Sequence, residues 1–240
     1  MNRMKKKEKL ETGSESWRGL IKKGAAHFNV IVDEKTTRLF AIHAGELIRW
    51  NKKINLTAIL NPLEIAVKHF VDSIALAPML PEQARVLDIG SGGGFPGLPL
   101  KAARPDLSII MIDASRKKIN FLKHVIRETG FEDIEAIHGR AEDIAGNLLR
   151  GKTFDAVVCR AFASLENFVL KGAPFVSQNG VLIALKGKAG EDEAGKFLSN
   201  QVKNPDLRNS EEKFNIMVKK YRLPFLDLER SLIRVKKRLK

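Results

Sequence analysis

The sequence predicts an α/β fold, in which a mostly parallel, seven-stranded sheet is covered by helices on both faces and preceded by a helical appendage. From Ala84 onward, short apolar runs alternate with amphipathic helical stretches, as they do in βαβ units. Before Ala84 the apolar residues recur only at helical spacing. We therefore expect a basic, flexible tail over residues 1–30, the helical appendage over residues 31–80 and the sheet domain over residues 81–240.

The individual elements follow from the spacing of apolar residues. Residues 33–77 are expected to be helical, with Pro62 opening a second short helix and with one apolar face made of Leu39, Ile42, Leu47, Ile48 and Trp50. Five apolar runs predict parallel strands at 86–89, 108–112, 134–137, 154–159 and 181–185. The helices of the sheet domain are expected at 98–104, 116–129, 142–149, 165–176 and 191–201. Two weaker candidates, 214–221 and 231–235, are expected to form an antiparallel hairpin at the sheet edge.

Charge and composition narrow the class of protein. Among 240 residues, 42 are Lys or Arg and 28 are Asp or Glu, so the formal net charge is +14. A surplus of this size favours a polyanionic partner such as nucleic acid over a merely soluble basic protein. Cys159 is the sole cysteine, which excludes an internal disulfide or a multi-cysteine zinc site. No apolar run approaches the roughly 20 residues of a membrane helix, and no signal-peptide core follows the basic N-terminus. We expect a cytoplasmic monomer with no membrane or metal partner.

A glycine-rich turn follows the first predicted strand. Four of the five residues 90–94 are glycines, which allow a tight turn and a close approach of a ligand to the backbone. Gly92, Gly94 and Gly97 also match the dinucleotide fingerprint, which alone is a weak signal. Asp88 lies two residues before the turn, where a carboxylate would repel a pyrophosphate and attract the ammonium group of a methionine moiety. The turn therefore favours S-adenosylmethionine over a dinucleotide, and a turn without a ligand is the remaining alternative.

Further acidic residues follow the next two strands. Asp113 comes 19 residues after Gly94, and about 20 residues is the spacing at which an acid reaches the ribose hydroxyls of a nucleoside. The alternative is a turn residue that caps the next helix through Ala114 and Ser115. Glu142, together with the acid after it, either accepts a hydrogen bond from an adenine amino group or simply favours the start of a helix.

The fourth strand restricts the chemistry of methyl transfer. It ends at Arg160, which is placed to hold either the substrate or the cofactor carboxylate, and no Asn/Asp-Pro-Pro-aromatic motif follows it. Cytosine C5 methylation needs a cysteine nucleophile, but Cys159 lies inside an apolar strand, where a small buried hydrophobe is the better interpretation. No catalytic base or nucleophile is evident. Guanine N7 needs neither, because it carries a free lone pair and only has to be aligned with the methyl group.

Several blocks of sequence resemble one known family. They are residues 50–57, 69–73, 87–99, 160–164 and 184–187, and together they resemble the ribosomal RNA small subunit methyltransferase G family, also called glucose-inhibited division protein B. The resemblance implies a Rossmann-like class I methyltransferase that transfers a methyl group from S-adenosylmethionine to N7 of a guanine in 16S ribosomal RNA, either naked or in an assembling 30S subunit. It also implies that the cofactor contacts Gly90, Phe95, Asp113, Ala114, Ser115, Ala141, Glu142 and Arg160. Asp88 and Gly92 of the glycine turn complete the set of expected cofactor residues.

The candidates for the substrate side are polar residues before and after the glycine turn, namely Asn51, His69, Asp72, Arg160 and Lys186. A lone histidine is more often structural, and Lys186 either pairs with an RNA phosphate or is an ordinary exposed lysine. Two other functions stay open, a methyltransferase of small molecules or proteins and a catalytically silent nucleic-acid-binding module. The charge of +14 disfavours the first, and the intact glycine turn disfavours the second.

Overall fold

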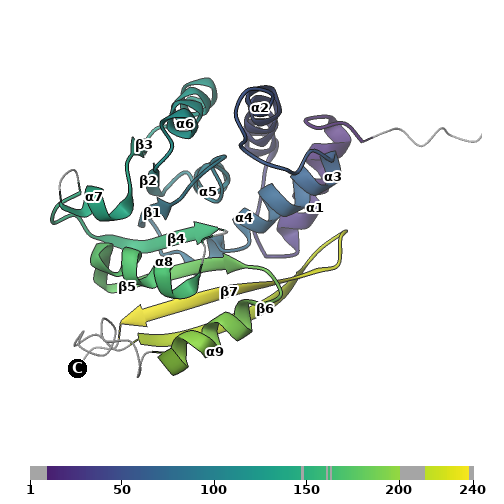
Figure 1. Ribbon diagram of the computed structural model, residues 1–240. Helices are drawn as coiled ribbons and strands as arrows, with labels where there is room; N and C mark the ends of the chain where they lie inside the picture. Colours follow the sequence, from purple (N-terminus) through teal and green to yellow (C-terminus); the bar gives the residue numbers. More distant parts are fainter. Residues whose placement is uncertain (1–9, 147–148, 161, 163, 201–213, 238–240) are drawn as a thin grey trace, which may run out of the picture.

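A seven-stranded sheet with the order β3-β2-β1-β4-β5-β7-β6 forms the centre of the structure. The structure is a computed structural model that describes residues 10–146, 149–160, 162, 164–200 and 214–237. The first five strands are parallel and the last two are antiparallel, as predicted (Figure 1). The strands are β1 (Arg85–Ile89), β2 (Ser108–Asp113), β3 (Ile134–His138), β4 (Phe154–Arg160), β5 (Val176–Lys186), β6 (Phe214–Leu223) and β7 (Leu228–Lys237).

Helices cover both faces of the sheet, because alternate residues of each strand are apolar on both sides. On one face, Leu87 and Val157 pack with α7 (Ala141–Gly146), α8 (Leu165–Gly172), the short helix η3 (Ala173–Phe175) and α9 (Gly190–Asn200). On the other face, Val86 and Val158 pack with α5 (Gly97–Ala103), α6 (Arg116–Thr129) and the helices of the N-terminal region. The predicted hairpin at the sheet edge is formed by β6 and β7.

The N-terminal region consists of α1 (Glu15–Ala26), α2 (Glu34–Asn51), α3 (Pro62–Glu64), the π-helix η1 (Ile65–Val71), α4 (Asp72–Ile74) and the short helix η2 (Ala77–Met79). The expected flexible tail over residues 1–30 is wrong from α1 onward, while residues 1–9 lie outside the described part of the chain. Ser14 caps α1 by accepting a hydrogen bond from the Trp17 N–H. The Trp17 side chain is fully buried, and its indole N–H donates to the Pro62 carbonyl at 2.9 Å.

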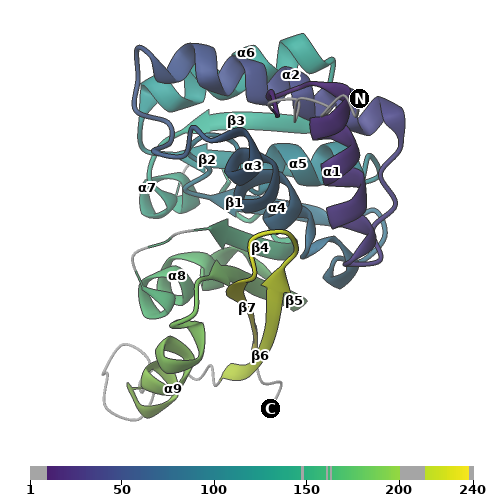
Figure 2. The same cartoon turned by 90° about the vertical axis from the view of Figure 1, so that its right-hand side faces the viewer.

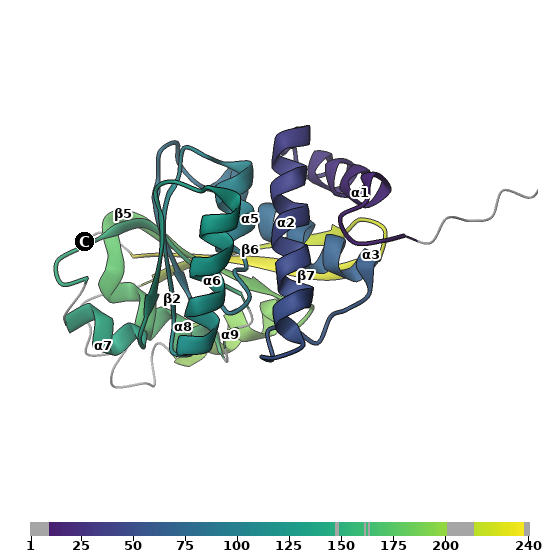
Figure 3. The same ribbon diagram turned by 90° about the horizontal axis from the view of Figure 1, so that it is seen from above.

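Helix α2 lies beside α6 (Figure 3). Of its predicted apolar face, Leu47 is buried and Leu39, Ile48 and Trp50 pack against the core, while Ile42 does not. The buried residues of α2 are Thr37, Phe40, His43, Ala44 and Leu47. Ile42, which was expected on the buried face, is 39% exposed, because it lies on the opposite side of the helix from Phe40 and Ala44. The stripe through Phe40, Ala44 and Leu47 has regular helical spacing, and it places His43 in the core. No helix within the described ranges is long and apolar enough to cross a membrane.

Candidate functional site

The carboxyl ends of β1, β2 and β4 meet at one edge of the sheet. The strand order reverses between β1 and β4, because β1 pairs with both β2 and β4. In open parallel sheets, ligands bind at such a switch point. The fold therefore brings Asp88, Asp113 and Arg160 to one crevice from three separate parts of the sequence.

Asp88 is a fully buried acid at the end of β1. Its Oδ2 accepts a hydrogen bond from the Gly97 N–H at 3.0 Å, while its Oδ1 has no hydrogen-bond partner among the described residues. Burial raises the pKa of this carboxyl to about 7, although the Gly97 N–H, the Ser91 hydroxyl and the Arg160 guanidinium partly oppose that rise. A buried acceptor without a donor is unfavourable, so the free oxygen suits the ammonium group of S-adenosylmethionine.

Asp113 orders the glycine turn. Its Oδ2 accepts from the Gly92 N–H at 3.0 Å, and its Oδ1 accepts from the Ser115 N–H at 2.8 Å. Oδ1 thus organises the start of the next helix, as the alternative interpretation expected, while Oδ2 holds the glycine turn. Each oxygen of a carboxylate can accept a second hydrogen bond, which leaves capacity for a ribose hydroxyl.

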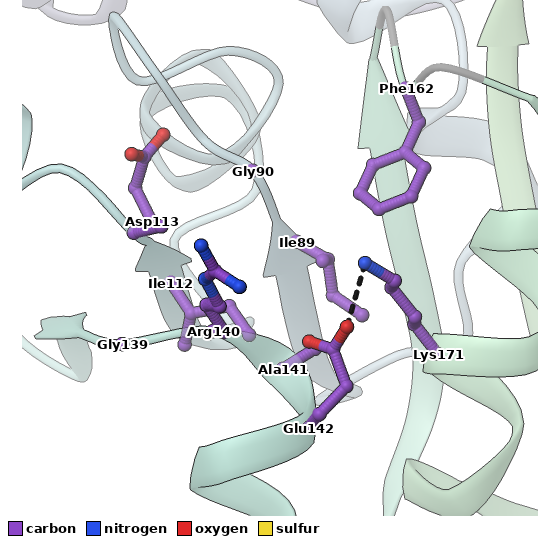
Figure 4. A pocket seen from close by; sticks show the side chains of 11 residues that line it. Ile89, Gly90, Ile112, Asp113, Gly139, Arg140, Ala141, Glu142, Phe162 and Lys171 are labelled. Atoms are coloured by element: carbon purple, nitrogen blue, oxygen red, sulfur yellow. Dashed lines mark ion pairs between the residues drawn. The ribbon is translucent and has the colours of Figure 1, made fainter.

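A cavity of about 280 Å³ opens beside Gly90, and we call it the Gly90 cavity (Figure 4). Five predicted cofactor residues gather in its wall, which is made of Ile89, Gly90, Ile112, Asp113, Ala114, Gly139, Arg140, Ala141, Glu142, Phe162 and Lys171. Gly90 has a φ of +75°, a conformation that favours glycine. The apolar side chains of this wall suit the adenine ring of an adenosine, and its two acids, Asp113 and Glu142, suit the hydroxyl and amino groups.

Glu142 points toward the Gly90 cavity from α7, and Lys171 comes to meet it from α8 (Figure 4). The Lys171 ammonium lies 2.7 Å from Glu142 Oε1, and this contact holds the pKa of Glu142 below its usual range. Glu142 is therefore an ionised acceptor at neutral pH. The prediction that it meets the adenine amino group stays a prediction.

Phe95 does not line the Gly90 cavity. Instead its ring stacks with His43 at 4.6 Å and with His69 at 4.4 Å between centroids, and the Arg160 guanidinium lies over it at 4.6 Å. His43 Nε2 lies 2.7 Å from the Gly93 carbonyl oxygen, which ties α2 to the glycine turn. Burial lowers the pKa of His43 to about 4 and that of His69 to about 2. Both imidazoles are consequently neutral at pH 7.

Arg160 ends β4 and is half-buried. Its guanidinium donates to the Lys68 carbonyl at 2.9 Å, so it anchors the π-helix to the sheet. Burial lowers the pKa of Arg160 to about 10, against the attraction of the Asp72 and Asp88 carboxylates. The side chain is thus a cation at pH 7 that contacts the Lys68 carbonyl and the Phe95 ring, a structural role that the sequence did not reveal.

A second cavity of about 350 Å³ lies next to Arg160, and we call it the Arg160 cavity. Four predicted substrate residues are in its wall, which is made of Ile59, Lys68, His69, Asp72, Arg160, Leu185, Lys186, Gly187 and Arg230. Asn51 is not among them. Its side chain accepts from the Leu56 and Thr57 N–H groups and donates to the Thr57 carbonyl, so it shapes the loop after α2.

Two charged residues of the Arg160 cavity, Lys186 and Asp72, are held by hydrogen bonds and ion pairs to other elements. Lys186 lies 2.7 Å from Glu193 and donates to the Phe162 carbonyl at 2.9 Å. Its side chain is 6% exposed, so the interpretation as an ordinary exposed lysine is wrong. Asp72 is also buried. It accepts from the Tyr221 hydroxyl at 2.6 Å, and Arg230 Nε lies 3.5 Å away.

The single cysteine is a structural residue. Cys159 is fully buried in β4, and burial raises the pKa of its thiol. A neutral, inaccessible thiol is not a nucleophile, in agreement with the prediction. Across the described parts of the chain, no group of three or more His, Cys, Asp or Glu side chains is arranged to hold a metal ion.

A glycine turn at the switch point of this sheet, with an unpaired buried carboxylate beside it and an acid-lined cavity next to it, defines an S-adenosylmethionine-dependent methyltransferase of class I. A family model described as rRNA small subunit methyltransferase G matches residues 36–214, and the chain belongs to that family. A protein of Geobacter sulfurreducens named ribosomal RNA small subunit methyltransferase G is 39% identical over 219 residues, which cover 90% of this chain and 95% of that protein.

Solved structures share the fold. The cofactor-bound Rv0187 from MTB superimposes with a TM-score of 0.56 at 17% identity, covering 87% of this chain and 92% of that one. M. jannaschii TYW2 in complex with AdoMet gives a TM-score of 0.53 at 14% identity, covering 70% of this chain and 75% of that one. At such identities the likeness concerns the fold alone.

Proposed function

We propose that this protein transfers a methyl group from S-adenosylmethionine to N7 of a guanine in 16S ribosomal RNA of the small ribosomal subunit. Membership of the family supports the RNA of the small subunit as the substrate. The formal charge of +14 supports a polyanionic acceptor, since a field of this sign concentrates nucleic acid near the protein.

The observation that carries the choice of N7 is that neither His69 nor Asp72, the imidazole and the carboxyl in the wall of the Arg160 cavity, is both basic and without a partner. His69 has a pKa of about 2, and a group of such low basicity cannot take a proton from an amine effectively. The Asp72 carboxylate faces the Tyr221 hydroxyl and Arg230. Guanine N7 has no proton to remove, so a site that only aligns the acceptor is sufficient for it.

The residues of the crevice then have separate tasks. When bound, S-adenosylmethionine supplies a methyl group activated by a sulfonium centre. Asp88 Oδ1 accepts from the ammonium group of the cofactor, which gives the buried oxygen its missing donor. Asp113 accepts from the ribose hydroxyls, and Glu142 accepts from the adenine amino group. These assignments extend the contacts that the three acids already make with the surrounding chain.

The test is a methyl-transfer assay with labelled S-adenosylmethionine on 16S RNA, on 30S particles and on protein substrates. We expect label in the RNA at a position that borohydride reduction followed by aniline cleaves, because N7 methylation makes the guanine ring reducible. Label found only in protein, or in RNA that aniline leaves intact, would contradict the proposal. Comparison of naked RNA with 30S particles identifies the form of the substrate.

The oligomeric state and the cellular compartment of the enzyme belong to the same proposal. We expect the enzyme to act as a monomer in the cytoplasm, where the small subunit assembles. Sedimentation of the purified protein at micromolar concentration should give the mass of one chain, 26.8 kDa. A stable dimer would contradict the first of these statements.

A further inference from the structure

The Arg160 cavity is linked through Phe162 and Arg160 to the site that we propose for the cofactor. Phe162 connects the two cavities, because its ring lines the Gly90 cavity while its carbonyl accepts from Lys186 in the wall of the Arg160 cavity. Arg160 lies near enough to Asp88 for each charge to shift the pKa of the other. The Arg160 cavity therefore adjoins the part of the site in which the proposed function places the methionine end of the cofactor.

The π-helix η1 and the first residue of α4, which follows it directly, each place one polar side chain in this cavity. They are His69 and Asp72, and both line the cavity. π-Helical turns are rare and are frequently found at functional sites. The Thr57 hydroxyl lies 2.9 Å from His69 Nε2. We therefore assign the neutral imidazole to the wall of the cavity, and Asp72 to the role of hydrogen-bond acceptor for a ligand.

Burial raises the pKa of the Asp72 carboxyl, and the Tyr221 hydroxyl and the Arg160 and Arg230 guanidinium groups oppose that rise. The β6–β7 hairpin reaches across to α4 and supplies the Tyr221 hydroxyl and the Arg230 guanidinium (Figure 2). A buried ion pair is seldom the most stable way to fill a space. The carboxylate has four lone-pair sites, and these two partners leave acceptor capacity on a side chain that lines an open cavity.

The geometry of guanine matches this acceptor. N7 and O6 are on one edge of the base, and the N1–H and N2–H donors are on the Watson–Crick edge. When N7 faces the methyl group, the donor edge points away from the cofactor. Enzymes that modify bases recognise an extruded base through that edge. Adenine presents a lone pair at N1 in place of the donor, and a carboxylate repels it.

We propose that the Arg160 cavity receives the acceptor guanine and that Asp72 selects it by accepting hydrogen bonds from its N1–H and N2–H groups. This assignment rests on the proposed function and deepens it, because it names the residue that makes the enzyme specific for guanine.

The first measurement uses wild-type enzyme alone. Once the methylated position is mapped, a synthetic RNA fragment spanning it is made with guanine or with inosine, which lacks the N2 amino group, at that position. Loss of one buried hydrogen bond should lower kcat/KM for inosine by about 10- to 100-fold. Equal rates for the two bases would overturn the assignment.

The second measurement uses Asp72→Asn, with the exposed Asp227→Asn as the matched control. Asp227 is in the hairpin turn, where it pairs with Arg222. We expect Asp72→Asn to lose at least about 100-fold in kcat/KM on guanine and most of the preference over inosine, while the cofactor Kd stays within about threefold. The control should keep wild-type rates and preference.

Two results would overturn the role of Asp72. One is an Asp72→Asn enzyme that keeps the wild-type ratio of guanine to inosine rates, and the other is a loss of cofactor binding that parallels the loss of activity. The proposed function fails separately, when wild-type enzyme gives no N7-methylated product. If Asp72→Asn does not fold, the wild-type comparison of the two bases still decides the assignment.

Discussion

The substitution Asp88→Asn should affect the stability of the protein and its affinity for the cofactor in opposite directions as the pH rises from 5 to 8. Burial raises the pKa of Asp88 from its usual 3.8 to about 7. Because the folded-state pKa is above the unfolded-state value, folding disfavours the charged form. The resulting penalty is absent below about pH 4, grows as the pH rises toward 7 and is complete above it. It amounts to about 2 kcal/mol at pH 5 and about 4 kcal/mol at pH 8.

The Asn side chain keeps an oxygen that can accept from the Gly97 N–H, but it carries no charge. Its advantage over Asp88 should therefore grow by about 2 to 3 kcal/mol between pH 5 and pH 8, whatever constant difference the amide introduces. The same variant should bind S-adenosylmethionine at least about tenfold more weakly, since the ammonium group loses its ionic partner. Urea denaturation at both pH values and calorimetric titration of the cofactor measure the two effects.

Asp106→Asn is the matched control with the opposite sign. The Arg104 guanidinium holds the pKa of Asp106 at about 2, so this carboxylate stabilises the fold above about pH 4 and loses that contribution as the pH falls toward 2. Its replacement should lower stability equally at pH 5 and pH 8. An Asp88→Asn effect that is also equal at the two pH values would refute the burial argument, and an unchanged cofactor Kd would show that Oδ1 does not meet the ammonium group.

Three further substitutions test separate parts of the fold and the site. Trp17→Ala should lower the free energy of unfolding by about 3–5 kcal/mol, because the indole is fully buried and bonded to Pro62; a urea denaturation midpoint like that of wild type would mean that α1 is not part of the core. Gly94→Ala should cost about 1–3 kcal/mol in the same assay, since Gly94 has a φ of +90° and a Cβ atom there would collide with Leu98. Glu142→Ala should raise the cofactor Kd by about 3- to 10-fold, measured by calorimetry. The free energy of unfolding should change by less than about 1 kcal/mol, because the side chain is half exposed. Parallel losses of stability and affinity would contradict a direct contact between Glu142 and the cofactor.

The features that could be predicted from the sequence are those encoded by neighbouring residues. Helix α6 (Arg116–Thr129) has the bounds that apolar periodicity predicted. The strands at 86–89 and 134–137 are within one residue of their observed bounds. The glycine turn and the acid at the end of β2 also meet in one cavity as expected. Each of these signals depends on a few consecutive side chains or on a spacing that the βαβ pattern fixes.

The features that escaped prediction depend on contacts between distant segments. Phe95 stacks with His43 and His69, yet nothing in the spacing of these residues indicates that α2 and the π-helix meet at the glycine turn. Tyr221 and Arg230 join the site only because β7 pairs with β5. Helix α1 did carry a local signal, a capping serine followed by Trp17, Ile21 and Ala25 at four-residue steps, which the surrounding lysines obscured.

The position of β7 in the sheet has a consequence for synthesis on the ribosome. The wall of the Gly90 cavity is complete once residue 171 has been added, because it is built from residues 89–171. The wall of the Arg160 cavity includes Arg230, and Asp72 is bonded to Tyr221. This cavity is therefore incomplete until the β6–β7 hairpin has been synthesised and β7 has paired with β5. The residues that line the proposed site of the methyl donor are therefore all synthesised before Tyr221 and Arg230, which complete the proposed site of the methyl acceptor.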